Sequence, residues 1–209
     1  MTERQGKILR GTVLGIIISI LLVIVLLSLG GARKPAIYLY PESDSFINVK
    51  LDVNGIIVKE VPECNNGWNV FATKQGLINQ KYDYLFYEAL LKKVELPDSG
   101  WIVDYDNLAP WLEINLTKLG LNEKEKVQFM EYWIKTLPRA NYYEIKLLDN
   151  KFLEENMNLI VSPRPDTVIR LMFHFKPFRE KIAVPEPKII TPERLGFTVV
   201  EWGGILDIF

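Results

Sequence analysis

A long uncharged run near the start of the chain constrains this protein more than any other sequence feature. Residues Thr12 to Leu29 carry no charged side chain, and most of them are Leu, Ile or Val. As a helix, these eighteen residues would be about 27 Å long, close to the hydrocarbon thickness of a bilayer. The run therefore predicts a transmembrane helix over residues 12–30.

The charges that flank this run predict its orientation. Three basic residues lie within residues 1–11, whereas only Arg33 and Lys34 follow the run closely. This bias favours a cytoplasmic tail at residues 1–11 and places the rest of the chain outside. A cleaved secretory signal peptide is the alternative, but the run is longer than the usual apolar core of such a peptide. We therefore predict a retained signal anchor in a single-pass protein of the cell membrane.

The rest of the chain, residues 35–209, is long enough to form one domain with a sizeable core. It carries 20 basic and 25 acidic residues, and this mildly acidic balance disfavours nucleic acid as a partner. Cys64 is the only cysteine and His174 the only histidine, so the usual cysteine and histidine metal sites cannot form. We predict a single extracytoplasmic domain with no metal and no cofactor.

Short alternating runs separated by turn residues predict an antiparallel sheet. Phe46–Val53 alternates between apolar and polar residues, Asn54-Gly55 is typical of a type I′ turn, and Ile56–Val61 continues the pattern. We therefore expect these two segments to pair as a β-hairpin. Further strand-like runs occupy residues 36–40, 68–73, 82–90, 142–148, 157–161, 167–175 and 195–202.

The middle of the chain has the periodicity of two amphipathic helices. The first extends from Leu108 to Leu119, and the second begins at Asn122, where Glu125 completes a capping box. The apolar stripe predicted for the second helix consists of Val127, Met130, Ile134 and Leu137, widened by Phe129 and Trp133. The predicted fold class is α+β: an N-terminal transmembrane helix, then an antiparallel β-sheet or sandwich-like domain with two amphipathic helices packed on it.

Two carboxylates are the candidate catalytic residues. Glu88 and Glu201 each share a strand with aromatic or aliphatic residues, and burial among such groups raises the pKa of a carboxyl. A pair of carboxylates on one side of a cleft could hydrolyse a glycosidic bond. The alternative is that each glutamate lies at a sheet edge or pairs with an arginine such as Arg139, Arg164 or Arg194.

The aromatic residues include two candidates for ligand binding. Trp101 and Trp202 both lie beside turns, where an exposed ring could bind a sugar or a peptide; if buried, each is part of the core. His174 falls on the more polar face of its strand, which predicts a solvated side chain. No partner for general-base catalysis lies near His174 in the sequence.

Two segments resemble motifs of an uncharacterised bacterial family. Residues Lys34–Pro41 read KPAIYLYP and residues Gly196–Gly204 read GFTVVEWGG, matching KPxIYLYP and GFxVxEWGG patterns near the two ends of that family. The resemblance implies a single extracytoplasmic domain that spans both motifs. The family has no established activity, so the resemblance assigns no catalytic residue and only draws attention to Glu88, Glu201 and Trp202.

Together these features predict a membrane-anchored extracytoplasmic binding or interaction module of the bacterial cell envelope. Residues 12–30 would contact the membrane, and the partner would be an envelope protein or a cell-wall polymer. The alternative is an envelope hydrolase that uses Glu88 and Glu201. A third possibility, a structural subunit of an envelope assembly, requires a large exposed apolar patch.

Overall fold

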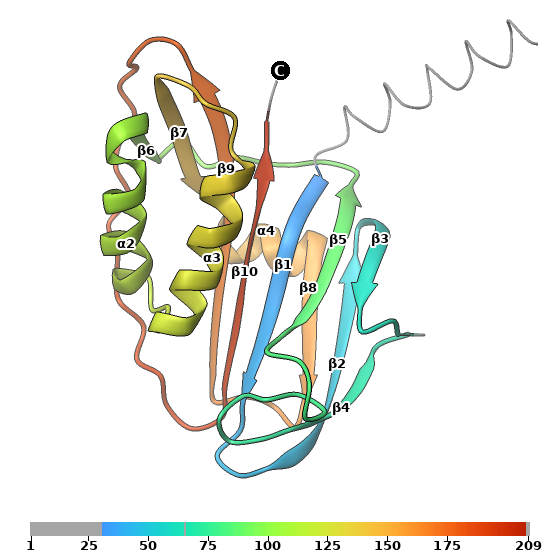
Figure 1. The fold of residues 1–209 in the computed structure, drawn as a ribbon. Helices are drawn as coiled ribbons and strands as arrows, with labels where there is room; N and C mark the ends of the chain where they lie inside the picture. Colours follow the sequence, from blue (N-terminus) through green and yellow to red (C-terminus); the bar gives the residue numbers. More distant parts are fainter. Residues whose placement is uncertain (1–30, 65, 208–209) are drawn as a thin grey trace, which may run out of the picture.

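The computed structural model describes residues 31–64 and 66–207, and this part of the chain is mostly β-sheet. Its strands form two sheets, which are accompanied by three α-helices (Figure 1). The predicted α+β class is therefore wrong, because a second sheet, and not helices alone, covers the faces of the first.

The transmembrane prediction is also contradicted. The helices of the described ranges have 11, 14 and 7 residues, fewer than the roughly 20 that a membrane-spanning helix needs. None of them is long and apolar enough to cross a bilayer, so the single-pass, cell-membrane prediction finds no support there. The segment predicted to span the membrane, residues 12–30, lies outside the described residues.

The larger sheet has seven strands in the order β3-β5-β1-β10-β9-β7-β6. It is mixed, because β10 runs parallel to β9, whereas an antiparallel sheet was predicted. Parallel neighbours need a long crossover, and the proline-rich residues 179–197 supply it. The strands are β1 (Gly31–Tyr40), β3 (Gly55–Val61), β5 (Leu85–Leu91), β6 (Trp101–Asp104), β7 (Tyr142–Leu147), β9 (Thr167–Phe178) and β10 (Thr198–Leu206).

The smaller sheet has three strands in the order β4-β2-β8, and it overturns the predicted hairpin. Its strands are β2 (Ser45–Val53), β4 (Trp68–Ala72) and β8 (Met157–Ser162). β2 pairs with β4 and β8, whereas β3 pairs with β5 in the other sheet. Asn54 and Gly55 therefore carry the chain from one sheet to the other. Gly55 is required there because a Cβ would lie 2.0 Å from the Leu90 carbonyl oxygen.

Helices α2 (Leu108–Lys118) and α3 (Glu123–Thr136) pack on one face of the large sheet (Figure 1). The predicted capping box of Asn122 and Glu125 is confirmed. The predicted apolar stripe is wrong in part, because Val127 and Ile134 are 41% and 43% exposed. The larger rings of Phe129 and Trp133 occupy the buried face instead. A short third helix, α4 (Asn150–Asn156), precedes β8 and was not predicted.

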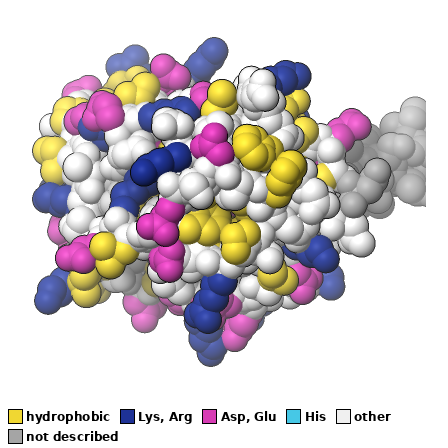
Figure 2. Space-filling view, turned by 90° about the horizontal axis from the view of Figure 1, so that it is seen from below, with side chains coloured by type: hydrophobic (Ala, Val, Ile, Leu, Met, Phe, Trp, Pro, Cys, Tyr) yellow, Lys and Arg dark blue, Asp and Glu magenta, His cyan; other side chains and the backbone are white. Residues whose placement is uncertain are grey.

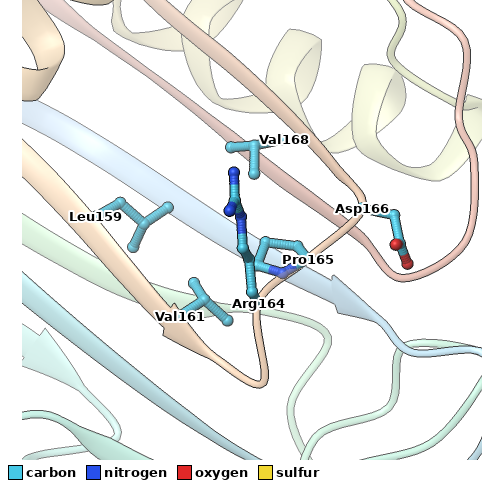
Figure 3. Close-up of a pocket in the computed structure, with 6 residues that line it drawn as sticks. All are labelled: Leu159, Val161, Arg164, Pro165, Asp166 and Val168. Carbon is cyan, nitrogen blue, oxygen red and sulfur yellow. The ribbon is translucent and has the colours of Figure 1, made fainter.

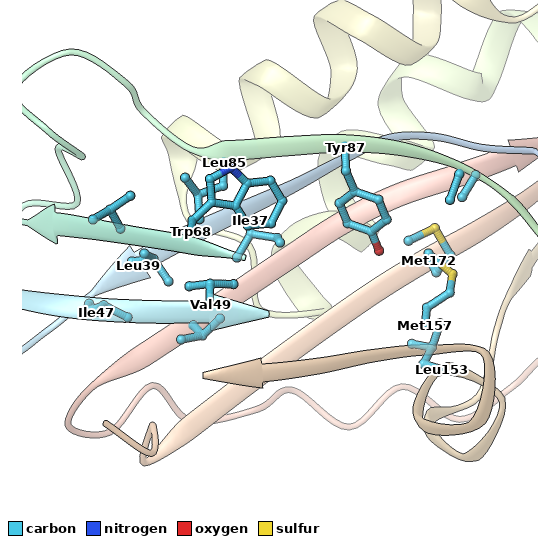
Figure 4. Close-up of a cluster of buried hydrophobic side chains, with 14 of the residues drawn as sticks. Ile37, Leu39, Ile47, Val49, Trp68, Leu85, Tyr87, Leu153, Met157 and Met172 are labelled. Atoms are coloured by element: carbon cyan, nitrogen blue, oxygen red, sulfur yellow. The ribbon is translucent and has the colours of Figure 1, made fainter. Parts of the chain in front are cut away.

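Each face of the large sheet has its own core. The sandwich core lies between the two sheets and is mostly aliphatic (Figure 4). The helix-side core lies under α2 and α3 and is rich in aromatic rings. Successive residues of a strand point to opposite faces, so Glu201 of β10 points into the sandwich core and Trp202 into the helix-side core.

Candidate functional site

The two motif segments lie side by side at the centre of the large sheet. β1 and β10 pair in antiparallel fashion, with Ala36 opposite Trp202 and Tyr38 opposite Val200. The Tyr38 and Trp202 rings are 6.2 Å apart, and a Cβ on Gly203 would lie 2.9 Å from the Pro35 Cα. Close packing accounts for these residues, and they do not line an open cleft.

Glu201 is fully buried and paired. Its carboxylate accepts hydrogen bonds from Arg170 Nε at 2.6 Å and from the Tyr87 hydroxyl at 2.7 Å. Arg170 also donates to the Met157 carbonyl, which links the large sheet to β8 of the small one. Burial, and then the charge of Glu201, raise the pKa of Tyr87 well above its usual value, so its hydroxyl stays a donor. Glu201 therefore pairs with an arginine, but the partner is Arg170 and none of the three arginines named from sequence.

Glu88 lies on the other side of the sheet from Glu201. Its neighbour Tyr87 points into the sandwich core, where it contacts Glu201, so Glu88 points toward the helix side. Across the sheet, Glu88 is paired in register with Lys59 of β3. The structure does not bring the two carboxylates together, and a paired-carboxylate hydrolysis has no geometric support.

The other candidates from sequence are buried. Trp101 and Trp202 are 4% and 0% exposed, so neither ring forms a surface platform. His174 is only 4% exposed, so the prediction of a solvated side chain is wrong. Its Nε2 lies 3.8 Å from Asp207 Oδ2. Burial lowers the pKa of His174, which favours a neutral ring at pH 7. Within residues 31–64 and 66–207, no cluster of three His, Cys, Asp or Glu could hold a metal ion.

A surface that combines two positive charges with several aromatic rings lies beside α3, where the helices leave β5 and β3 uncovered (Figure 1). We call it the lysine shelf; it consists of Lys34, Lys59, Tyr84, Phe86, Glu88 and Tyr132. The ammonium groups of Lys34 and Lys59 lie 4.5 Å and 5.0 Å from the centroid of the Phe86 ring. Both cations therefore converge on one ring and lie within about 10 Å of each other.

Two β-bulges aim these lysines. In β1, Ala32 faces the sandwich core and Ala36 the helix-side core, so the irregularity between Arg33 and Ala36 reverses the alternation around Lys34. Lys34 has a φ of 55°, unusual for a residue with a side chain. In β3, the bulge after Ile57 places Lys59 opposite Glu88 on the helix side. Bulges commonly re-aim a side chain beside a functional site.

The shelf leaves its two cations without anionic partners in the described ranges. Lys34 donates a 2.8 Å hydrogen bond to the Tyr84 hydroxyl, a neutral group. No carboxylate of residues 31–64 and 66–207 lies within 4.0 Å of either ammonium, although Glu88 is the cross-strand neighbour of Lys59. The ammonium groups of Lys34 and Lys59 can therefore bind an anion beside the Phe86 ring.

Sequence reasoning missed the shelf for a physical reason. Lys34 belongs to the first motif and precedes a proline, and these two features mark its position in the sequence. Lys59 gave none, because the bulge that turns it depends on pairing between β3 and β5. A pattern of alternation assigns Lys59 and Ile57 to the same face, and only the tertiary pairing separates them.

Comparison with known proteins gives a relative but no activity. A protein of Butyrivibrio fibrisolvens described as "Uncharacterized protein in bglA 3'region" is 51% identical over 65 residues, which are 28% of this chain and 68% of that protein. No family model matches the chain. No solved structure matches it either.

Proposed function

Because the chain belongs to the same family as this Butyrivibrio fibrisolvens protein, whose description gives no activity, we propose a function from the shelf itself. The protein is a binding module that holds an acidic polysaccharide on the lysine shelf. The observation that carries this proposal is the convergence of Lys34 and Lys59 on the Phe86 ring, each aimed there by its own bulge.

The electrostatics of the shelf favour an anionic ligand. An exposed cation–π contact contributes only about 0.5–1 kcal/mol, so the ring orders the two ammonium groups without neutralising them. Two like charges at this separation repel each other, and a carboxylate or phosphate placed between them would remove that repulsion. Glu88 offsets part of the positive charge and would weaken such binding.

The rings beside the lysines favour a sugar polymer over an acidic peptide. Tyr84 and Tyr132 are half-buried around Lys34, whose ammonium lies 4.7 Å and 5.9 Å from their centroids. Partly exposed tyrosine rings pack against the flat apolar face of a sugar, and their hydroxyls can bond to its polar edge. Aspartate and glutamate side chains offer no such flat face. A repeating polymer also compensates for a weak single site by multivalency.

Other functions have less support. An envelope hydrolase would need Glu88 and Glu201 on one side of the sheet. A structural subunit would need a broad apolar patch, whereas Figure 2 shows small groups of hydrophobic side chains scattered among charged and other atoms at the lower end of the molecule. An envelope protein or cell-wall polymer as the partner stays a prediction.

The test is binding of the purified full chain to polygalacturonate, with uncharged dextran as the comparison polymer. We expect binding to polygalacturonate that weakens with added salt, and no binding to dextran. The double variant Lys34→Gln/Lys59→Gln should lose at least about tenfold in affinity, because both charged contacts disappear. The matched control is Lys118→Gln/Lys188→Gln, which removes two exposed lysines elsewhere.

The control variant should bind as the wild type does. An equal loss of affinity for polygalacturonate in both double variants would show that binding depends only on the net charge of the protein. Dextran binding as tight as polygalacturonate binding would exclude an acidic ligand. Glu88→Gln should change the affinity in the opposite direction from Lys34→Gln/Lys59→Gln. It should raise the affinity for polygalacturonate about twofold to threefold in affinity electrophoresis, since it removes from the shelf a half-buried negative charge that repels the acidic polymer. A drop in affinity would assign Glu88 a direct contact with the ligand instead.

A further inference from the structure

A hollow opens between β8 of the small sheet and β9 of the large sheet (Figure 3). It lies where β8 ends and β9 begins, and its volume is about 330 Å³. We call it the side mouth; its lining residues are Leu159, Val161, Arg164, Pro165, Asp166 and Val168.

The side mouth exists because the small sheet is narrower than the large one. The small sheet ends at β8, so no further strand covers the start of β9. Val168 precedes Ile169 of the helix-side core and therefore faces the small sheet, yet it is 49% exposed. Leu159 and Val161, on the inner face of β8, form the opposite apolar wall and are only partly buried.

One cation lies across this apolar opening. The Arg164 side chain extends from the turn after β8 into the space between Leu159 and Val168 (Figure 3). Within the described ranges, Arg164 makes no hydrogen bond and no ion pair. The adjacent carboxylate does not neutralise it, because Asp166 points away and accepts a 2.8 Å hydrogen bond from the Phe197 amide.

We propose that the side mouth binds a single acyl chain that ends in a carboxylate. The chain would lie on Leu159, Val161 and Val168, and the carboxylate would pair with the Arg164 guanidinium, which suits a carboxylate in bidentate geometry. The volume is at the lower end of the range for small-molecule sites, which favours a chain of medium length. The site has an apolar wall on each side and one guanidinium at its opening. These features suit an acyl chain with a carboxylate and do not suit an uncharged polymer.

The test uses laurate and its uncharged analogue dodecanol, titrated into the full chain by calorimetry below their aggregation concentrations. We expect one saturable laurate site. Arg164→Gln should weaken laurate binding about tenfold and leave dodecanol binding unchanged, because only the carboxylate contacts the guanidinium. Arg179→Gln removes an exposed arginine elsewhere and should bind laurate as the wild type does.

A second variant tests the apolar part of the site. Val168→Trp fills the opening and should abolish binding of both laurate and dodecanol, with thermal unfolding showing that the fold persists. Absence of a saturable laurate site in the wild type would overturn the proposal. So would equal laurate affinity in Arg164→Gln and the wild type, and that comparison decides the matter even if Val168→Trp fails to fold.

Discussion

The two faces of the large sheet are buried by different means. On the helix side, aromatic rings interlock: Phe129 lies 5.3 Å from both Phe173 and Trp202, centroid to centroid. On the sandwich side, aliphatic residues dominate, and a buried polar group of Tyr87, Glu201 and Arg170 crosses the core. The stability of the helix-side core thus depends on close packing of its rings. The stability of the sandwich core also requires that its buried charges are fully paired.

Neither cover is as wide as the sheet it protects, and this difference locates both proposed sites. The helices end before β5 and β3, which leaves the lysine shelf beside Tyr132 of α3. The small sheet ends at β8, which leaves the side mouth beside Val168 of β9. Each proposed site therefore combines the exposed margin of a core with one or two cations that have no carboxylate partner among the described residues.

The largest effect is expected on the sandwich side, for Glu201→Leu. The change leaves Arg170, whose side chain is 9% exposed, as a buried charge without its carboxylate partner. We therefore expect a loss of about 3–5 kcal/mol in the free energy of unfolding. Urea denaturation of the full chain measures it. The double variant Glu201→Leu/Arg170→Met should recover most of the loss, because it removes both charges. If Glu201→Leu is within about 1 kcal/mol of the wild type, the buried pair does not control this face.

Three residues further along β10, Gly204→Ala tests the helix side. A Cβ at this position would lie 2.5 Å from the Trp133 ring, so overpacking should cost about 1–3 kcal/mol. Gly31→Ala is the matched control, since its nearest neighbour would be an ordinary 3.6 Å away. Equal urea midpoints for both variants would mean that the aromatic core has room to adjust.

A smaller effect concerns pH and the buried His174. Burial lowers its pKa below the ordinary 6.5, against the opposing influence of Asp207 and Glu144 and with that of Lys176 and Lys146. The unfolded chain therefore binds a proton that the folded chain excludes, and wild-type stability should fall as the pH drops below about 6.5. Denaturation midpoints from pH 8 to pH 5 should fall less steeply for His174→Gln. Identical slopes would show that other groups govern the acid response.

The smallest effect is expected on the outer face of α3. Ile134 belongs to the stripe predicted from sequence but is 43% exposed, so Ile134→Gln should change stability by no more than about 0.5 kcal/mol. Thermal unfolding of the full chain measures it. A loss above about 1 kcal/mol would mean that Ile134 packs on the sheet, as the predicted stripe required.

Local signals predicted what depends on local contacts. Asn122 and Glu125 form the capping box that their spacing indicates, because both partners lie within one helical turn. The Asn54-Gly55 signal failed, because Asn54 pairs with Asn156 and Lys92, far away in the chain, and not across a hairpin. Glu201 was found as a buried carboxylate, but its partners Arg170 and Tyr87 come from two other strands.

By itself, the sequence determined the strand-rich character of residues 35–209, the two central helices and the capping box of the second helix. These follow from periodicity and from groups a few residues apart. The tertiary structure alone decided which strands share a sheet, which face of α3 is buried and where Lys34, Lys59 and Arg164 point. Those outcomes depend on pairing between distant segments and on where each covering layer ends, and a pattern along one strand contains neither.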